Sequence, residues 1–385
     1  MIKQHLFTPG PTHIPPQVFA AMAQPTLHHR TEAFERVFDS AKKGYSTLVG
    51  GDHETIFLAS SGSGAMEAAL TNAVKPGEKI IYINAGKFGE RWGDISRALS
   101  IEAIQIFAEA GQSPELSIIG DVVKNNLDAR AFCVQYTESS TALLHPVPEI
   151  SRLVHQLAPE MLIFVDAISA VATLDIPLAQ LPIDILIGAS QKALMLPPGL
   201  AILSISARAW NVIESIPRRS LYFDLPLERK VHKKSTSAWT PAMNIILGLD
   251  CSLKMLQEEG LMQTYKRHSI AAEVARAGLT SLNLKLLSEH YPAPGVTAAI
   301  LPNNIDAEKV REKLVADFAI QIAGGQDELK GKIIRIGHMG YMTAFDVITA
   351  LSALEIVLKK FGHKFTTGCS LMAAQQVLES HGGIV

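Results

Sequence analysis

The chain has 385 residues, of which 48% are hydrophobic and 19% charged, and its 35 basic and 37 acidic side chains give a formal net charge of −2. This balance gives no overall attraction to nucleic acid or to an anionic membrane, and no apolar stretch approaches the roughly 18 residues that a membrane span requires. Three cysteines are too few for a disulfide framework or a cysteine-based zinc site, so we expect a soluble cytoplasmic protein of two domains without a bound metal.

The first half of the chain alternates short apolar runs with amphipathic segments. The apolar runs predict strands at residues 54–60, 79–83, 130–135, 161–165, 184–188 and 199–204, the last of them antiparallel. Helices with one apolar stripe are predicted at residues 66–74 and 148–157, and Ser61–Gly64 is predicted to form a tight turn before the first helix. Strands that are buried on both faces and separated by helices are typical of a largely parallel α/β sheet.

The pattern changes after about residue 205. Residues 218–240 are basic and are predicted to form a loop, whereas residues 241–280 are helical with a break at Gly260. Beyond them, strands at 298–301 and 332–336 mix with amphipathic helices, and the last clear helix has an apolar stripe from Val347 to Leu358. We therefore expect a smaller α+β domain at the C-terminus. The predicted division is an N-terminal arm (1–19), a large domain (20–259) and a small domain (260–385).

Polar residues directly follow four apolar runs. They are Ser61-Gly62-Ser63, Glu138-Ser139-Ser140-Thr141, Asp166 and Ser190-Gln191-Lys192. In an open parallel sheet, ligands bind beyond the carboxyl ends of the strands. These four groups are therefore expected to meet at one edge of the sheet and to form the binding site.

The segment Ser61–Gly64 lies between a predicted strand and a predicted helix. Backbone N–H groups, two hydroxyls and the positive end of the helix dipole would form a phosphate cradle there. The alternative is a glycine turn that only joins the strand to the helix. A dinucleotide site is less favoured because the third glycine of its motif would fall at Glu67, and the Gly-Lys-Ser/Thr of a nucleoside triphosphate loop is absent.

Asp166 ends one strand and Lys192 follows the next, and each also has a purely structural interpretation. A carboxylate at a strand end can pair with a protonated heterocyclic nitrogen, or it can cap a helix. Burial lowers the pKa of a lysine, which can then form a Schiff base, whereas a lysine on a loop is simply solvated. A phosphate cradle, an aspartate and a lysine are the three groups that pyridoxal 5′-phosphate requires, so this cofactor is predicted.

Several short motifs extend this interpretation. They are Gly62–Leu70, Glu138–Thr141, Val165-Asp166, Gly188–Lys192 and Pro197-Pro198-Gly199. In their order and spacing the sequence resembles the class V aminotransferases of the fold-type I pyridoxal-phosphate superfamily, close to the alanine–glyoxylate and serine–pyruvate aminotransferases. The resemblance runs from Thr8–Pro11 to Ile334–Gly337. It implies a mostly parallel seven-stranded sheet between helices, with a smaller C-terminal α+β domain.

The resemblance assigns cofactor contacts to individual residues. Lys192 would hold the cofactor as a Schiff base, and Asp166 would pair with its pyridine nitrogen. The phosphate would be bound by Ser61, Gly62, Ser63 and Gln191. The ring would be contacted by Phe88, Ser139 and Ile168. Thr240 would reach the phosphate of a neighbouring subunit, which implies a homodimer with shared active sites.

Substrate contacts are implied in the same way. Arg335 matches the arginine that clamps the substrate α-carboxylate, and a planar guanidinium suits that task because it offers two parallel hydrogen bonds. Gly10 of the N-terminal arm would close the site near this carboxylate, and Ser139 would also face the substrate. The implied reaction is a ping-pong transfer of an amino group from alanine or serine to glyoxylate or pyruvate.

Two other functions remain open at this point. His29 and Arg30 resemble a His-Arg stretch that in related branches serves a substrate phosphate or phosphonate, so phosphoserine or 2-aminoethylphosphonate transamination is the alternative. A simple entrance loop without substrate contact also explains these two residues. From a different class of function, the chain could be a non-enzymatic regulator that binds pyridoxal phosphate, or a subunit of a larger complex.

Overall fold

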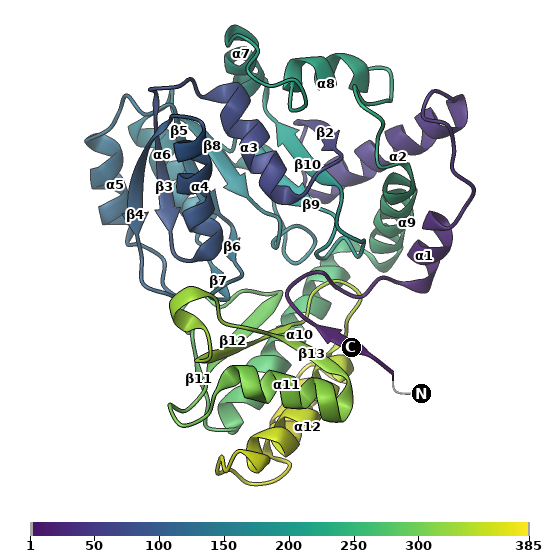
Figure 1. Ribbon diagram of the computed structural model, residues 1–385, viewed down its shortest axis with the longest axis vertical. Helices are drawn as coiled ribbons and strands as arrows, with labels where there is room; N and C mark the ends of the chain where they lie inside the picture. The colour runs from purple at the N-terminus through teal and green to yellow at the C-terminus, as the bar shows by residue number, and fades with distance from the viewer. Residues whose placement is uncertain (1–2, 384–385) are drawn as a thin grey trace.

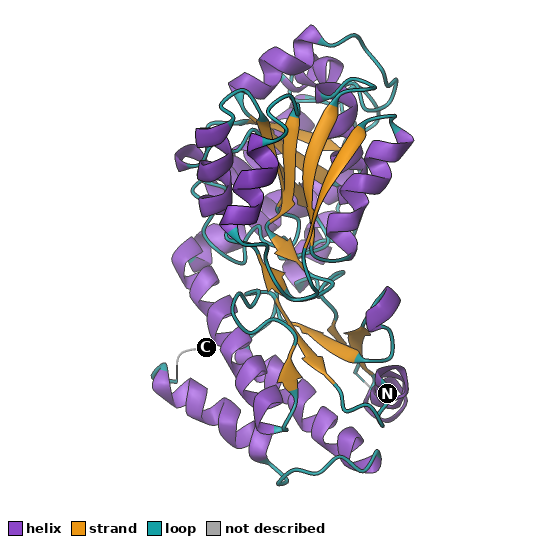
Figure 2. Cartoon of the chain, turned by 90° about the vertical axis from the view of Figure 1, so that its left-hand side faces the viewer, coloured by secondary structure: helices purple, strands orange, loops and turns teal. Residues whose placement is uncertain are grey.

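The computed structural model describes residues 3–383, which form two main sheets with helices around each (Figures 1 and 2). The larger sheet has seven strands in the order β2-β10-β9-β8-β5-β3-β4. Their bounds are β2 (Glu54–Leu58), β3 (Lys79–Asn84), β4 (Glu102–Phe107), β5 (Ala131–Gln135), β8 (Leu162–Asp166), β9 (Ile185–Ala189) and β10 (Ala201–Ile205). Only β10 runs antiparallel to its neighbours. The predicted fold, a mostly parallel seven-stranded sheet between helices, is confirmed.

Successive residues of the central strands face opposite layers of helices. In β8, Ile163 and Val165 belong to the core on one face, whereas Phe164 belongs to the core on the other. Burying a side chain such as Phe164 stabilises the fold by roughly 1.5–3 kcal/mol, which explains why the middle positions of these strands are apolar on both faces. The first layer includes α2 (Glu32–Leu48), α5 (Leu116–Lys124), α6 (Val147–Leu157) and α9 (Met243–Glu259). The second includes α3 (Gly62–Ala73), α4 (Lys87–Ala98) and α7 (Ala207–Ser215).

The second sheet has five strands in the order β1-β13-β14-β12-β11. Their bounds are β1 (His5–Phe7), β11 (Lys285–Leu286), β12 (Val296–Ile300), β13 (Ile320–Gly324) and β14 (Ile333–Gly337). A separate core joins this sheet to helices α10 (Leu261–Ser281), α11 (Ala307–Phe318), α12 (Ala344–Lys360) and α13 (Cys369–Ser380). A short hairpin, β6 (Thr137–Glu138) with β7 (Leu143–Leu144), follows β5. The division of the chain near residue 260 stays a prediction.

The N-terminal arm contacts both sheets. Its strand β1 pairs in parallel with β13, and its helix α1 (Pro16–Met22) packs on α9, where Asn244 Nδ2 donates to the carbonyl of Met22 at 2.6 Å. The segment between them runs through the space between the two sheets (Figure 1). This path brings the arm to the carboxyl ends of the large sheet's strands.

Helices α8 and α13 differ from what the sequence pattern predicted for their segments. The basic region predicted as a loop contains α8 (Leu225–His232), because Asp224 caps it by accepting a hydrogen bond from Leu227 N at 2.9 Å. Helix α13 follows the helix predicted to be the last clear one, because the buried Glu355 carboxylate accepts hydrogen bonds from Gly368 N and Ser370 N, both at 2.8 Å. Helix α3 already begins at Gly62, so the predicted tight turn is its first turn.

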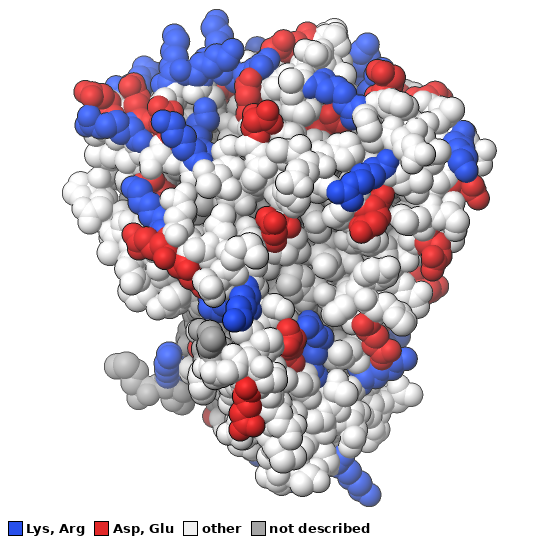
Figure 3. Space-filling view, turned by 180° about the vertical axis from the view of Figure 1, so that it is seen from behind, with Lys and Arg blue, Asp and Glu red and all other residues white. Residues whose placement is uncertain are grey.

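Charge is mixed over the surface. Figure 3 shows acidic and basic side chains interspersed over one face, with Lys and Arg gathered at the end of the molecule that carries α8. Two of these basic residues, Arg229 and Arg218, pair with Glu54 and Asp224 respectively. Among residues 3–383 the structure contains no helix with the length and apolar character needed to cross a membrane.

Candidate active site

Four strand ends meet at one edge of the large sheet, as the parallel topology requires. Asp166 is the last residue of β8, and its register partner is Gln135 at the end of β5. Lys192 follows β9, and Ser61 follows β2. Because β9, β8 and β5 are neighbours in the sheet, the side chains that follow them are brought together from distant parts of the sequence.

Lys192 is held in a buried position by the N-terminal arm. Its amine donates a hydrogen bond to the Pro9 carbonyl, and the Thr12 hydroxyl donates to the Lys192 carbonyl at 2.8 Å. Burial lowers the pKa of Lys192 to about 8, against the opposing effect of the nearby Asp166 carboxylate. An amine with this pKa releases and takes up a proton near neutral pH, which suits a general base or a nucleophile.

Gly10 allows the arm to approach Lys192 this closely. A Cβ atom at Gly10 would lie 2.6 Å from Lys192 Nζ, and the backbone at this residue has a φ of +116°. On the other side of the arm, a Cβ atom at Gly337 would lie 2.3 Å from the Thr8 carbonyl oxygen. The arm therefore lies between Lys192 and the end of β14, with no room for a larger residue at either glycine.

One carboxylate oxygen of Asp166 accepts a hydrogen bond within the protein, and the other accepts none from the described residues. Its Oδ1 accepts a hydrogen bond from Ile168 N at 3.0 Å, whereas no group of the described residues donates to Oδ2. Burial raises the pKa of Asp166 to about 6 and outweighs the opposing hydrogen bond from Ile168. Above that pH the residue is a carboxylate that can accept a hydrogen bond from a protonated ring nitrogen of a ligand.

The N-terminus of α3 presents unpaired donors. The N–H groups of Gly62 and Ser63 have no acceptor among residues 3–383, and the Ser61 side chain makes no capping bond. A Cβ atom at Gly62 would lie 2.2 Å from Ile168 Cδ1, so only glycine allows this close approach. Arg91 adds a cation, donating from Nη1 to Ser63 Oγ at 2.9 Å. The arrangement suits a phosphate group.

Phe88 lies in the first turn of α4, close to the lysine. The amine of Lys192 is 6.0 Å from the centre of its ring, and the guanidinium carbon of Arg91 is 5.0 Å from it. The Phe88 peptide N–H donates to Glu138 Oε2 at 3.1 Å, and its carbonyl accepts from Gln135 Nε2 at 3.0 Å. The ring is thus held at the same edge as the reactive groups.

Arg335, on β14 of the smaller sheet, reaches across to the large one. Its Nε donates to the Gly324 carbonyl at 2.8 Å, and its Nη1 donates to the Ser139 carbonyl at 2.7 Å. Burial lowers the pKa of Arg335 to about 10, so the group still carries its charge at neutral pH. Its Nη2 has no partner among the described residues. The N–H groups of this nitrogen are therefore available to donate hydrogen bonds to an anion.

The remaining predicted site residues have no hydrogen bond to Lys192, Asp166 or Arg335 through their side chains among the described residues. Ser139 Oγ accepts a hydrogen bond from Ser169 Oγ at 3.4 Å, and the buried Oε1 atom of Gln191 has no partner. Thr240 is exposed beside the end of β2. No hydrogen bond or ion pair of the described residues joins His29 or Arg30 to Lys192 or Arg335; instead His29 accepts one from Thr236. The functional role of each of these residues stays a prediction.

Sequence reasoning did not assign a role to several groups at this edge. They are Pro9, Arg91, Gln135 and Glu138. Arg91 carries a detectable signal, because it lies three residues after Phe88 and so shares a face of α4 with it. The contact of Pro9 with Lys192 joins residues 183 positions apart and has no local signal.

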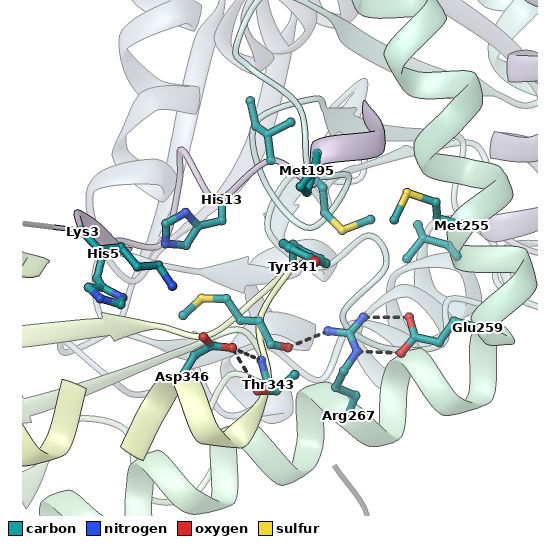
Figure 4. Close-up of a pocket in the computed structure, with 14 residues that line it drawn as sticks. Lys3, His5, His13, Met195, Met255, Glu259, Arg267, Tyr341, Thr343 and Asp346 are labelled. Carbon is teal, nitrogen blue, oxygen red and sulfur yellow. Dashed lines mark hydrogen bonds and ion pairs between the residues drawn. The ribbon is translucent and has the colours of Figure 1, made fainter. Parts of the chain in front are cut away.

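A separate cavity of about 660 Å³ lies beside the arm (Figure 4). Its apolar lining includes Met195, Met255 and Tyr341. Two of its charged groups pair with each other: Arg267 binds Glu259 through two nitrogens and also donates to the Gly340 and Met342 carbonyls. The guanidinium of Arg267 is therefore occupied by acceptors of the protein itself.

Comparisons with known proteins agree with this geometry. The family described as "Aminotransferase class-V" matches residues 4–349. The soluble hydrogenase small subunit of Synechococcus sp. (strain PCC 6716) is 34% identical over 98% of this chain and 99% of its own length. The serine–glyoxylate aminotransferase of Methylorubrum extorquens is 29% identical over 98% of this chain and 97% of its own. The crystal structure of ureidoglycine–glyoxylate aminotransferase from Bacillus subtilis superimposes with a TM-score of 0.92 at 26% identity, covering 98% and 99% of the two chains.

The family match together with the fold identifies the protein as a transaminase. The match covers most of the chain, and the protein belongs to the class V aminotransferase family. The resemblance seen in the sequence is therefore confirmed at the level of the family and the class of reaction.

Proposed function

We propose that the protein is a pyridoxal-phosphate-dependent aminotransferase that moves an amino group from alanine or serine to glyoxylate or pyruvate. The observation that carries this proposal is the convergence of Lys192, Asp166 and the free N–H groups of α3 at one edge of the sheet, with Arg335 facing them. The names of relatives in the family favour glyoxylate as the acceptor.

The residues present fit the cofactor. The unpaired Gly62 and Ser63 N–H groups are hydrogen-bond donors that no acceptor among the described residues satisfies. Gly62 leaves space that a Cβ atom would remove. We propose that Ser61, Gly62, Ser63 and Gln191 hold the phosphate, that Asp166 pairs with the ring nitrogen, and that Lys192 carries the aldehyde. When bound, the cofactor supplies an electron sink for the bond broken at the substrate Cα.

The substrate is oriented by Arg335. Its unpartnered Nη2 faces a site where a carboxylate would gain a charge-assisted hydrogen bond, while Nε and Nη1 keep the guanidinium fixed. Gly10 brings the arm over the lysine and leaves little room above it, which favours small side chains. Fixing the substrate at its carboxylate determines which bond at Cα is aligned for cleavage.

Lys192 moves the proton. Because burial lowers the pKa of Lys192 to about 8, its Nζ can accept a proton from the substrate and return it within one catalytic cycle. The Pro9 carbonyl provides an acceptor that holds the amine beside the site. The proposal includes a ping-pong order, in which the 2-oxo acid formed from the first substrate leaves before the second substrate binds.

A half-reaction screen tests this function. Purified holoenzyme is mixed with alanine, serine, phosphoserine or 2-aminoethylphosphonate, and loss of the visible absorbance band is followed together with 2-oxo acid formation. We expect alanine or serine to react and the phosphorylated donors to be inert. A preference for phosphoserine would reject the proposed substrates, and a protein that neither binds pyridoxal phosphate nor transfers an amino group would reject the proposal altogether.

A homodimer with shared sites is part of the same proposal. Thr240 is exposed on this chain, as a residue that serves a neighbouring subunit would be. Light scattering of the purified protein tests the dimer. Mixing a Thr240→Ala chain with a Lys192→Ala chain tests sharing, because only hybrid dimers would then contain a site with both native residues.

A further inference from the structure

The Glu138 side chain is fully buried at the edge of the large sheet and receives four hydrogen bonds. Its Oε2 accepts from Phe88 N at 3.1 Å and from Gly89 N at 2.8 Å. Its Oε1 accepts from Ser140 N at 3.1 Å and from Ser140 Oγ at 2.5 Å. A buried carboxylate with this many donors is fixed in place, because losing any one of them would leave a buried donor unsatisfied.

Two of these donors belong to the first turn of α4. The carboxylate therefore occupies the place of a capping group at the positive end of that helix, although it comes from the hairpin after β5. Lys87 N donates to Ser140 Oγ at 3.0 Å, so three successive N–H groups of the turn are bound by this pair of residues. The position of the turn is set by Glu138 and Ser140.

The first turn of α4 also packs closely against strand β3 and the β6–β7 hairpin. A Cβ atom at Gly86 would lie 2.4 Å from Ser140 Oγ, and one at Gly89 would lie 2.7 Å from the Ile83 carbonyl oxygen. The Phe88 carbonyl accepts a hydrogen bond from Gln135 Nε2. The Phe88 backbone is thus bound through its N–H and its carbonyl, which fixes the direction in which the side chain leaves the helix.

We propose that Glu138 is a positioning residue, which sets the plane of the Phe88 ring in the cofactor site by fixing the first turn of α4. The inference rests on the proposed function and on the contact with the cofactor ring that the sequence resemblance implies for Phe88. In this proposal Glu138 acts through the peptide groups of Phe88 and Gly89. A shift of this turn would move the ring and Arg91 together, because both belong to the start of α4.

The chain offers a matched control for this role. Glu355 is also buried, and it caps α13 in the same way, accepting from Gly368 N and Ser370 N at 2.8 Å and from Ser370 Oγ at 2.6 Å. It lies in the smaller sheet's layer of helices, with no contact to the residues of the proposed site. Glu138→Gln and Glu355→Gln therefore make the same chemical change at two buried helix caps. Glu138→Gln also removes a charge that acts on Asp166, Lys192 and Arg335, whereas Ser140→Ala loosens the same turn and leaves that charge in place.

The test measures cofactor binding rather than turnover. Each variant is prepared without cofactor and titrated with pyridoxal 5′-phosphate. The dissociation constant, the visible circular dichroism of the bound cofactor and the melting temperature of the cofactor-free protein are recorded. We expect both variants to lose thermal stability, but only Glu138→Gln to bind the cofactor more weakly, by roughly tenfold, and to change the dichroism.

Either of two results would overturn the inference. One is a Glu138→Gln protein with the parent's dissociation constant and dichroism; the other is a Glu355→Gln protein with the same losses as Glu138→Gln. If Glu138→Gln does not fold, Ser140→Ala replaces it, with an expected loss of about threefold and the same dichroism criterion. A parent protein that does not bind pyridoxal phosphate would instead reject the proposed function, and this inference with it.

Discussion

Replacing Lys192 by methionine tests whether the structure buries a cation at this position. In the unfolded chain a lysine has its usual pKa of 10.5, whereas burial lowers the folded value to about 8. Between these two pH values the unfolded chain holds a proton that the folded protein lacks, so the parent becomes more stable as the pH rises. Below pH 8 the full cost of burying the charge is present.

The size of the effect follows from the same two values. At about 1.4 kcal/mol for each tenfold change in proton affinity, burial of the Lys192 cation costs about 3 kcal/mol at pH 7. Methionine removes this cost but also removes the hydrogen bond to the Pro9 carbonyl, worth about 1 kcal/mol. The cofactor-free Lys192→Met protein should therefore be about 2 kcal/mol more stable than the parent at pH 7, and about 1 kcal/mol less stable above pH 10.5.

Guanidinium unfolding of the cofactor-free proteins, followed by tryptophan fluorescence, measures this difference from pH 7 upwards. Lys230→Met serves as the control, because Lys230 is exposed on α8 and its replacement should give no trend with pH. A Lys192→Met protein that is less stable than the parent at pH 7, or a difference that is constant between pH 7 and 10.5, would refute the reasoning.

Three further predictions concern the proposed site. Arg335→Lys should lower kcat/KM for both substrates by about 10²-fold and leave the affinity for the cofactor unchanged. The control is Arg267→Lys in the neighbouring cavity, which should leave kcat/KM unchanged, and steady-state kinetics measures both variants. Asp166→Asn should slow the half-reaction by about 10²-fold, because a neutral amide does not favour the protonated form of a ring nitrogen; a variant with the parent's half-reaction rate would contradict the role of this carboxylate. Gly62→Val should destabilise the protein by about 1–3 kcal/mol and weaken cofactor binding, because the new side chain would collide with Ile168. Adding Ile168→Ala should partly restore the stability. If the two changes in unfolding free energy are strictly additive, the predicted collision between positions 62 and 168 is wrong.

The fold was predictable because its signals are local and repeated. Strands such as β8 are apolar at every position before their last residue, and a strand of this kind must be covered on both faces. Helix α8 was missed because its sequence is basic and its stability comes from a cap at Asp224 and an ion pair between Arg229 and Glu54, which joins two distant segments. Helix α13 depends in the same way on Glu355, which belongs to the preceding helix.

The site was predictable only where a residue ends a strand. Asp166 and Lys192 could be found because parallel strand ends must meet, whatever the rest of the chain does. Glu138 lies in one of the polar groups that follow an apolar run, but nothing in the sequence indicates that its carboxylate binds the start of α4. The contact of Pro9 with Lys192 depends on the path of the arm between the two sheets, which pairing of β1 with β13 determines.

The whole chain has a net charge of −2, but cationic side chains outnumber carboxylates at the candidate site. Some charged pairs, such as Arg36 with Glu32, are exposed at the surface, where an ion pair contributes little. Several charged side chains lie close enough at the edge of the large sheet to influence one another. The cations are those of Lys192, Arg335 and Arg91, and the carboxylates are those of Asp166 and Glu138. A phosphate at the N-terminus of α3 and a substrate carboxylate at Arg335 would add negative charge where the protein leaves N–H groups unpaired. In the proposed function such anionic ligands would offset the excess of cations over carboxylates at this edge, whereas the shifted pKa values of Lys192 and Asp166 come first from burial.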